Sequence, residues 1–260
     1  MNNQQRTIIV DLVERSLNQA EYHWKNGGYK LITESARRTG LEALNKSVMD
    51  SAPSKIPGHE IVQEGETIVD DFIAIVADMR NSTDHMLMAS NSIKLEGIQR
   101  VFYETSALLP ALEKTINIHR GGVTEYLGDG VLGFFKKDKE KPEQYIYDAH
   151  YAANDCLNNT LEIVNKAIGD RYDLPPLKIG IGLALSKALV SLSGIEGARH
   201  AKAYGECVFR ATKLSGGNNI ILIDSNLKIA WPSSKGGTLR FVLSDIGKGG
   251  VQGYRISAGG

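Results

Sequence analysis

The sequence predicts an α+β fold of the ferredoxin-like, split βαβ kind: an antiparallel sheet with helices packed on one face. Two observations carry this prediction. After residue 68, β-rich runs and longer helical patterns follow each other in the order strand, helix, strand, strand, helix, strand. The segment 123–135 (VTEYLGDGVLGFF) places an Asp-Gly turn between two β-rich runs. Such a turn is a strong hairpin signal, because both residues tolerate positive φ.

Composition excludes several classes of protein. The chain has 260 residues, with 30 Lys plus Arg balanced by 30 Asp plus Glu. A balanced charge argues against general binding to nucleic acid or to membrane surfaces. No apolar stretch approaches the roughly 20 residues that span a bilayer, and no signal-peptide core is visible at the N-terminus. The two cysteines lack metal-ligand spacing. We expect a cytoplasmic protein.

The first 68 residues are expected to form a helical extension and a linker. Apolar residues at helical spacing predict a helix to about residue 26, and a weaker helical pattern covers 29–50. Residues 51–58 (SAPSKIPG) are typical of a linker. The predicted division is therefore 1–68 for the extension and 69–260 for a second domain.

Within 69–260 the patterns predict each element in turn. Residues 71–78 form a near-continuous apolar run, which is typical of a central strand. A helical region then extends to about residue 118, and Pro110 should kink or divide it. The remaining expected elements are a helix at 142–168, strands at 178–185 and 188–192, a loop at 193–205, a helix at 206–214, a strand at 220–223, a helical turn at 226–230 and an antiparallel ribbon at 239–245 and 251–256.

Two aspartates end or join predicted strands. Asp78 closes the apolar run at 72–77, and Asp129 occupies the hairpin turn. If the two carboxylates converge, they form a site suited to a hard cation such as Mg²⁺. Taken alone, the Gly-Asp-Gly sequence is better explained as a simple hairpin turn, and the second carboxylate at Asp78 is what favours a metal site.

Four blocks in the same order resemble the catalytic domain of the class III nucleotidyl cyclases, the adenylate/guanylate cyclase family. They are residues 72–83 (FIAIVADMRNST), 125–134 (EYLGDGVLGF), 203–214 (AYGECVFRATKL) and 245–256 (DIGKGGVQGYRI). The resemblance that they define extends over residues 70–257, nearly all of the chain after the predicted linker. Any one block is a weak signal, whereas four in register are specific.

The resemblance implies an enzyme that converts a nucleoside triphosphate to a 3′,5′-cyclic nucleotide and pyrophosphate. Its cofactors would be two Mg²⁺ or Mn²⁺ ions per active site, bridged by Asp78 and Asp129 with the carbonyl of Met79 as an extra ligand. Two such ions about 3.5–4 Å apart activate the attacking hydroxyl and neutralise the leaving group.

The start of the helix after Asp78 would bind the β and γ phosphates, because free backbone N–H groups collect there. Ordinary helix capping explains the polar residues at this position equally well. The residues assigned to the nucleotide here are Met79, Arg80, Asn81, Ser82, Thr83 and, in the hairpin, Gly128.

The positions that select the base in this family depart from both purine patterns. Glu125 lies three residues before Gly128, and Lys202 lies three residues before Gly205. A carboxylate accepts from an amine or ring N–H and an ammonium donates to a carbonyl, so this pair suits uracil or cytosine. The alternative is that Glu125 and Lys202 pair with each other at a subunit interface.

The transition-state positions also depart from the family. Phe209 and Lys213 occupy the places of its asparagine and arginine. The candidate catalytic cations are Lys213 and Arg210, but Arg210 lies about 100° away around the helix and could substitute only if the helix is rotated or shifted. Lys213 keeps a cation without the planar fork of arginine. In the closing ribbon Ile246 replaces a phosphate-binding lysine, and Lys248, two residues further on, is the expected substitute.

These departures resemble the bacterial pyrimidine cyclases of Pycsar anti-phage systems, which make cyclic UMP or cyclic CMP as an alarm signal. The family also implies a head-to-tail homodimer, in which Lys202 and Lys213 of one subunit face Asp78 and Asp129 of the other. Three alternatives stay open: a purine cyclase, a catalytically silent nucleotide-binding relative, and an unrelated split βαβ binding domain.

Overall fold

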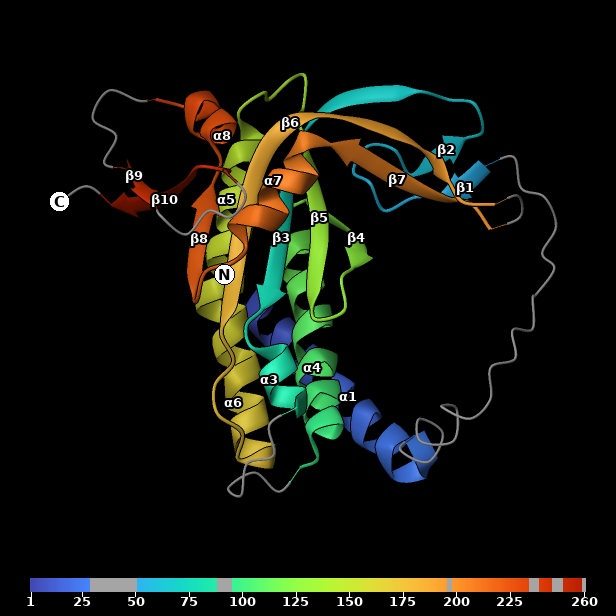
Figure 1. The fold of residues 1–260 in the computed structure, drawn as a ribbon, viewed down its shortest axis with the longest axis vertical. Helices are drawn as coiled ribbons and strands as arrows, with labels where there is room; N and C mark the ends of the chain where they lie inside the picture. The colour runs from blue at the N-terminus through green and yellow to red at the C-terminus, as the bar shows by residue number, and fades with distance from the viewer. Residues whose placement is uncertain (29–50, 88–94, 196–197, 234–238, 245–249, 259–260) are drawn as a thin grey trace.

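An eight-stranded sheet organises the computed structural model, which describes residues 1–28, 51–87, 95–195, 198–233, 239–244 and 250–258 (Figure 1). The strand order is β4-β5-β3-β6-β8-β10-β9, and β7 pairs with β6 outside this path. The strands are β3 (Ile68–Met79), β4 (Gly122–Tyr126), β5 (Gly130–Lys136), β6 (Ile179–Ser193), β7 (His200–Gly205), β8 (Ile220–Ile223), β9 (Leu239–Ser244) and β10 (Gly253–Ala258).

Helices connect and cover these strands. They are α1 (Asn3–His23), α3 (Ser82–Leu87), α4 (Gly97–Ile118), α5 (Gln144–Asp155), α6 (Leu161–Tyr172), α7 (Glu206–Leu214) and α8 (Ser225–Ala230). The short π-helical segments η1 (Trp24–Gly28) and η2 (Cys156–Thr160) extend α1 and join α5 to α6. Among the described residues, no helix is both long and apolar enough to cross a membrane.

The middle of the sheet confirms the predicted fold class. β3 pairs antiparallel with β5 on one side and with β6 on the other, and β4 pairs antiparallel with β5. The order β6-β3-β5-β4, with α4 between β3 and β4 and α5 to α6 between β5 and β6, is the split βαβ arrangement. The C-terminal ribbon β9–β10 is antiparallel, as expected.

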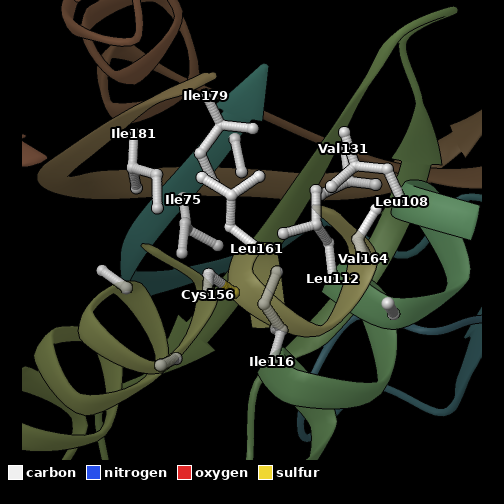
Figure 2. Packing of buried hydrophobic residues seen from close by; sticks show 14 of the residues in the cluster. Ile75, Leu108, Leu112, Ile116, Val131, Cys156, Leu161, Val164, Ile179 and Ile181 are labelled. Carbon is white, nitrogen blue, oxygen red and sulfur yellow. The ribbon is translucent and has the colours of Figure 1, made fainter. Parts of the chain in front are cut away.

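Both faces of β3 are buried, which explains its continuous apolar run. Ile73, Ile75 and Ala77 belong to a large cluster formed with α1, α4, α5 and α6. Figure 2 shows Ile75 beside residues from the helices of that layer. The alternate residues Phe72, Ala74 and Val76 belong to a second cluster that includes Cys207 and Ala211 of α7. The expectation of helices on one face is therefore wrong, because α7 covers the other (Figure 1).

Glycines bring α7 directly onto β6. A Cβ at Gly182 would lie 2.0 Å from the carbonyl oxygen of Ala211, and a Cβ at Gly180 would lie 2.1 Å from that of Ser215. These obstacles are backbone atoms, so no side-chain rotation relieves them. The close approach fixes the position of α7 on the sheet.

Three local predictions are corrected by the structure. The segment 51–58 expected as a linker begins with β1 (Ser51–Pro53), which pairs with β2 (Ile61–Gln63). Residues 178–192 form one strand rather than two. The loop expected over 193–205 contains β7, because β8 covers this edge of β6 only from Gly180 to Leu183 and leaves the rest free to pair. The helix expected over 29–50 lies outside the described residues.

Pro110 lies within α4, which continues through it as one helix. Ala107 and Leu108 on one side and Ala111 and Leu112 on the other are all buried against the core. The packing of both halves outweighs the backbone hydrogen bond that proline cannot make. The predicted division of this helix is therefore wrong.

The glycine contact makes a testable prediction. Replacing Gly182 with Ala should lower the free energy of unfolding by about 1–3 kcal/mol, because the added methyl meets the Ala211 carbonyl. The matched control is Gly169→Ala within α6, where the nearest atom to the new methyl is 3.8 Å away. This control should be neutral or should stabilise by about 0.5–1 kcal/mol. If chemical denaturation gave the same change in the free energy of unfolding for Gly182→Ala and Gly169→Ala, the packing argument would be contradicted.

Candidate active site

The two candidate metal aspartates lie side by side at one end of the sheet. In the register of β3 with β5, Asp78 faces Gly130, the residue directly after Asp129. The N–H of Met79 donates to the carbonyl oxygen of Asp129 at 3.1 Å. The sheet therefore joins the segments that carry both carboxylates, although they are about 50 residues apart in the sequence.

Gly130 is needed for this approach. A Cβ at this position would lie 2.7 Å from the carbonyl oxygen of Ala77 and 2.9 Å from Oδ1 of Asp78. Gly128 adopts a φ of +83°, in the left-handed region that favours glycine. The two glycines of the turn thus have separate roles: Gly128 forms the bend, and Gly130 leaves room for the neighbouring carboxylate.

Cationic and hydroxyl groups surround the two carboxylates. The guanidinium of Arg80 forms an ion pair with Asp78, and the hydroxyl of Ser82 donates to the carboxylate of Asp129. Burial lowers the pKa of Arg80, while the nearby Asp129 carboxylate acts in the opposite direction. Asn81 has a φ of 63°, and α3 begins directly after it at Ser82.

This donor set fits Mg²⁺ or Mn²⁺ bound together with a substrate. Among the residues that the structure describes, no group of three or more His, Cys, Asp or Glu side chains gathers to hold a metal ion. Mg²⁺ is commonly held by one or two carboxylates, with waters and substrate phosphates completing its octahedral shell. Asp78 and Asp129 supply those carboxylates.

A buried ionic cluster ties α3 to α4. Glu104 is fully buried, and its carboxylate contacts His85 Nδ1 and Arg100 Nε, each at 2.8 Å. No residue of α3 is buried, so the contact between His85 and Glu104 takes the place of apolar packing. Because α3 also carries Ser82, this cluster supports the group that binds Asp129. In the sequence, the only indication of this cluster was that Glu104 lies among apolar residues of a predicted helix.

The two predicted base-selecting residues meet within one chain. Lys202 Nζ on β7 lies 3.5 Å from Glu125 Oε2 on β4, across 77 residues of sequence. Both side chains are about one-third exposed, at 36% and 32%. The structure therefore brings Glu125 and Lys202, the two residues expected to select the base, close to each other. They pair within one chain rather than across a subunit interface.

The two cations of α7 point to different surroundings. Lys213 Nζ lies 5.3 Å from the ring centroid of Phe209, whose side chain is 60% exposed. Arg210 pairs with Glu206 at 3.1 Å and lies 4.0 Å from the buried carboxylate of Asp224. Burial raises the pKa of Asp224. Arg210 is thus engaged on its own side of the helix, which leaves Lys213 as the cation beside Phe209.

The remaining predicted residues are less constrained. Asn81, directly before α3, and Thr83, in its first turn, are exposed. Within the described residues, no hydrogen bond or ion pair joins Lys202 or Lys213 to Asp78 or Asp129. Lys248 lies outside the described residues.

Known proteins resemble this chain in sequence and in fold. No family model matches the chain. A uridylate cyclase from Treponema porcinum is 24% identical over 201 residues, which cover 76% of this chain. The chain spans 66% of the length of that relative.

Solved structures share the fold. The adenylyl cyclase CyaB from P. aeruginosa matches with a TM-score of 0.60 and 16% identity, over 75% of this chain and 97% of that one. The guanylate cyclase domain of RhGC from Catenaria anguillulae, in complex with GTP, matches with a TM-score of 0.53 and 16% identity, over 75% of this chain and all of that one (100%).

The chain therefore has the fold of the class III nucleotidyl cyclase catalytic domain, and the resemblance seen in its four sequence blocks is confirmed.

The buried cluster makes a prediction about stability. Replacing Glu104 with Ala should lower the free energy of unfolding by about 3–5 kcal/mol, because it leaves the buried Arg100 without its partner. As a control, Asp170→Ala removes the exposed i,i+4 partner of Lys166 and should leave the midpoint of urea denaturation unchanged. A Glu104 variant as stable as the control would contradict the role assigned to the cluster.

Proposed function

We propose that this chain is a nucleotide cyclase that converts a nucleoside triphosphate to a 3′,5′-cyclic nucleotide and pyrophosphate. The observation that carries the proposal is the adjacency of Asp78 and Asp129, which the pairing of β3 with β5 and the Met79 N–H bond hold together. The relative's name and the fold support the same class of reaction. The catalytic unit in this proposal is residues 69–260.

In this proposal the residues at the carboxylates, and Lys213 of a second copy, have stated roles. Asp78 and Asp129, with the carbonyl of Met79, would hold two Mg²⁺ or Mn²⁺ ions, and these ions would supply activation of the 3′ hydroxyl and neutralisation of pyrophosphate. Ser82 donates to Asp129 and so orients that carboxylate. Lys213 supplies positive charge to the α-phosphate, where charge develops during the displacement.

We further propose that the substrate is a pyrimidine nucleotide, UTP or CTP. The carboxylate of Glu125 and the ammonium of Lys202 lie 3.5 Å apart, so one acceptor and one donor are presented together. Uracil and cytosine carry complementary groups on neighbouring ring positions. The name of the curated relative supports uracil. The product would act as a second messenger, in keeping with the resemblance to anti-phage cyclases.

The proposed active unit is a head-to-tail homodimer. One chain places Asp78 and Asp129 together and places Glu125 near Lys202, yet no contact within the described residues connects the two pairs. A second copy would complete each site with its own Glu125, Lys202 and Lys213. Exposed aromatic side chains close to these residues supply apolar contact area for such a partner: Tyr126 at 50%, Tyr204 at 44% and Phe209 at 60% exposure.

The proposal predicts a specific loss of activity. Asp78→Asn and Asp129→Asn should each reduce cyclic nucleotide formation by more than about 100-fold, because each removes a charged ligand of the metal ions. The matched control is Asp71→Asn at the opposite end of β3, which should keep nearly full activity. The assay is product identification with Mn²⁺ or Mg²⁺ and each of the four ribonucleoside triphosphates. Triphosphate binding without any product would favour the silent relative instead.

Base selection gives a separate prediction. Glu125→Lys and Lys202→Glu should each change the ratio of kcat/KM between pyrimidine and purine triphosphates by about tenfold or more, since each replaces a hydrogen-bond donor with an acceptor or the reverse and so leaves a group of the base unpaired. Lys187→Glu, an exposed lysine of β6 paired with Asp71, is the control and should leave the ratio unchanged. Unchanged ratios in both test variants would remove Glu125 and Lys202 from base selection.

A further inference from the structure

Arg80 places a positive charge next to both candidate metal-binding aspartates, Asp78 and Asp129. Its guanidinium forms an ion pair with Asp78, and the carboxylate of Asp129 is close enough to interact with it electrostatically. The arginine side chain is only 15% exposed. A positive charge therefore already lies where the proposed function requires divalent cations.

The backbone of Arg80 is fixed, whereas its side chain has several rotatable bonds. The Arg80 N–H donates to the carbonyl oxygen of Lys178 at 2.8 Å, which holds the residue against the start of β6. The guanidinium is held separately, through Asp78: it forms the ion pair, and its Nε donates to the Asp78 carbonyl oxygen at 3.3 Å. The guanidinium can thus leave the carboxylate without unfolding the turn.

Arg80 interacts with both carboxylates, and a cation placed between two ionised carboxylates lowers their mutual repulsion. Within the described residues, Arg80 is the only side chain whose cation pairs with Asp78, and Ser82 contributes a neutral hydroxyl to Asp129. Divalent ions bound by the same oxygens would compete directly with this guanidinium. A guanidinium released beside metal-bound phosphates suits their oxygens, because its planar fork matches phosphate geometry.

We propose that Arg80 is an exchangeable counter-ion of the metal site: it neutralises Asp78 and Asp129 before substrate binds, and the incoming metal ions displace it onto the triphosphate. The inference rests on the proposed function, and it deepens that function by assigning Arg80 a specific exchange of partners. It follows that metal and triphosphate bind cooperatively, because the metal releases the group that then binds the phosphates.

The test measures binding rather than turnover. Isothermal titration with Mn²⁺ alone should show that Arg80→Met binds the ion about tenfold more tightly than the unchanged protein, since the competing cation is gone. With Ca²⁺ present, the same variant should bind a non-reactive α,β-methylene UTP about tenfold more weakly. Arg80→Lys keeps a cation without the fork, so its Mn²⁺ affinity should stay near that of the unchanged protein while its triphosphate affinity falls.

The control variant is Lys139→Met, which removes one exposed positive charge from the loop after β5, at the opposite end of the sheet. It should change neither affinity, which separates a local effect from a change in net charge. Unfolding temperatures without metal establish that each variant is folded, and Arg80→Gln replaces any variant that is not.

The outcomes separate the two proposals. If the unchanged protein binds Mn²⁺ and Asp78→Asn does not, but Arg80→Met binds it equally or more weakly, the counter-ion role is overturned and the metal site stands. If the unchanged protein binds no Mn²⁺ with or without nucleotide, the proposed function itself fails. Tighter metal binding together with weaker triphosphate binding in Arg80→Met is the result that supports the exchange.

Discussion

The antiparallel pairing of β3 with β5 is the constraint on which the candidate site depends. It places Asp78 opposite Gly130 and allows the Met79 N–H to bond the Asp129 carbonyl, so both carboxylates are positioned by backbone hydrogen bonds. Two side-chain contacts also hold the carboxylates: Arg80 forms an ion pair with Asp78, and the Ser82 hydroxyl donates a hydrogen bond to Asp129. Sites built on strand ends are more rigid than sites on long loops, which suits the metal-binding role proposed for these carboxylates.

Burial on both faces of the sheet makes this pairing stable. The helical layer of α1, α4, α5 and α6 covers one face of β3, and α7 covers the other. Glycines of β6 allow α7 to approach the sheet at backbone distance, which also fixes Lys213 relative to the strands. The surface-exposed groups of the site are therefore held by elements whose own positions are set by the core.

Local patterns predicted much of this architecture, and long-range contacts account for what they missed. Asp78 and Asp129 were recognisable because a strand end and an Asp-Gly turn are encoded by adjacent residues. The strand β7 was missed because its pairing depends on an edge of β6 that β8 leaves free. The contact of His85 with Glu104 joins residues 19 apart on separate helices, and no periodic pattern encodes it. Only the family resemblance linked Glu125 with Lys202.

The most direct test of the account is the position of the metal ions. Crystals grown with Mn²⁺ and a non-reactive pyrimidine triphosphate analogue would be measured for anomalous scattering from manganese. The account predicts anomalous peaks at coordination distance from carboxylate oxygens of both Asp78 and Asp129. Peaks bound to the triphosphate with either carboxylate turned away, or no peak beside these residues, would contradict it.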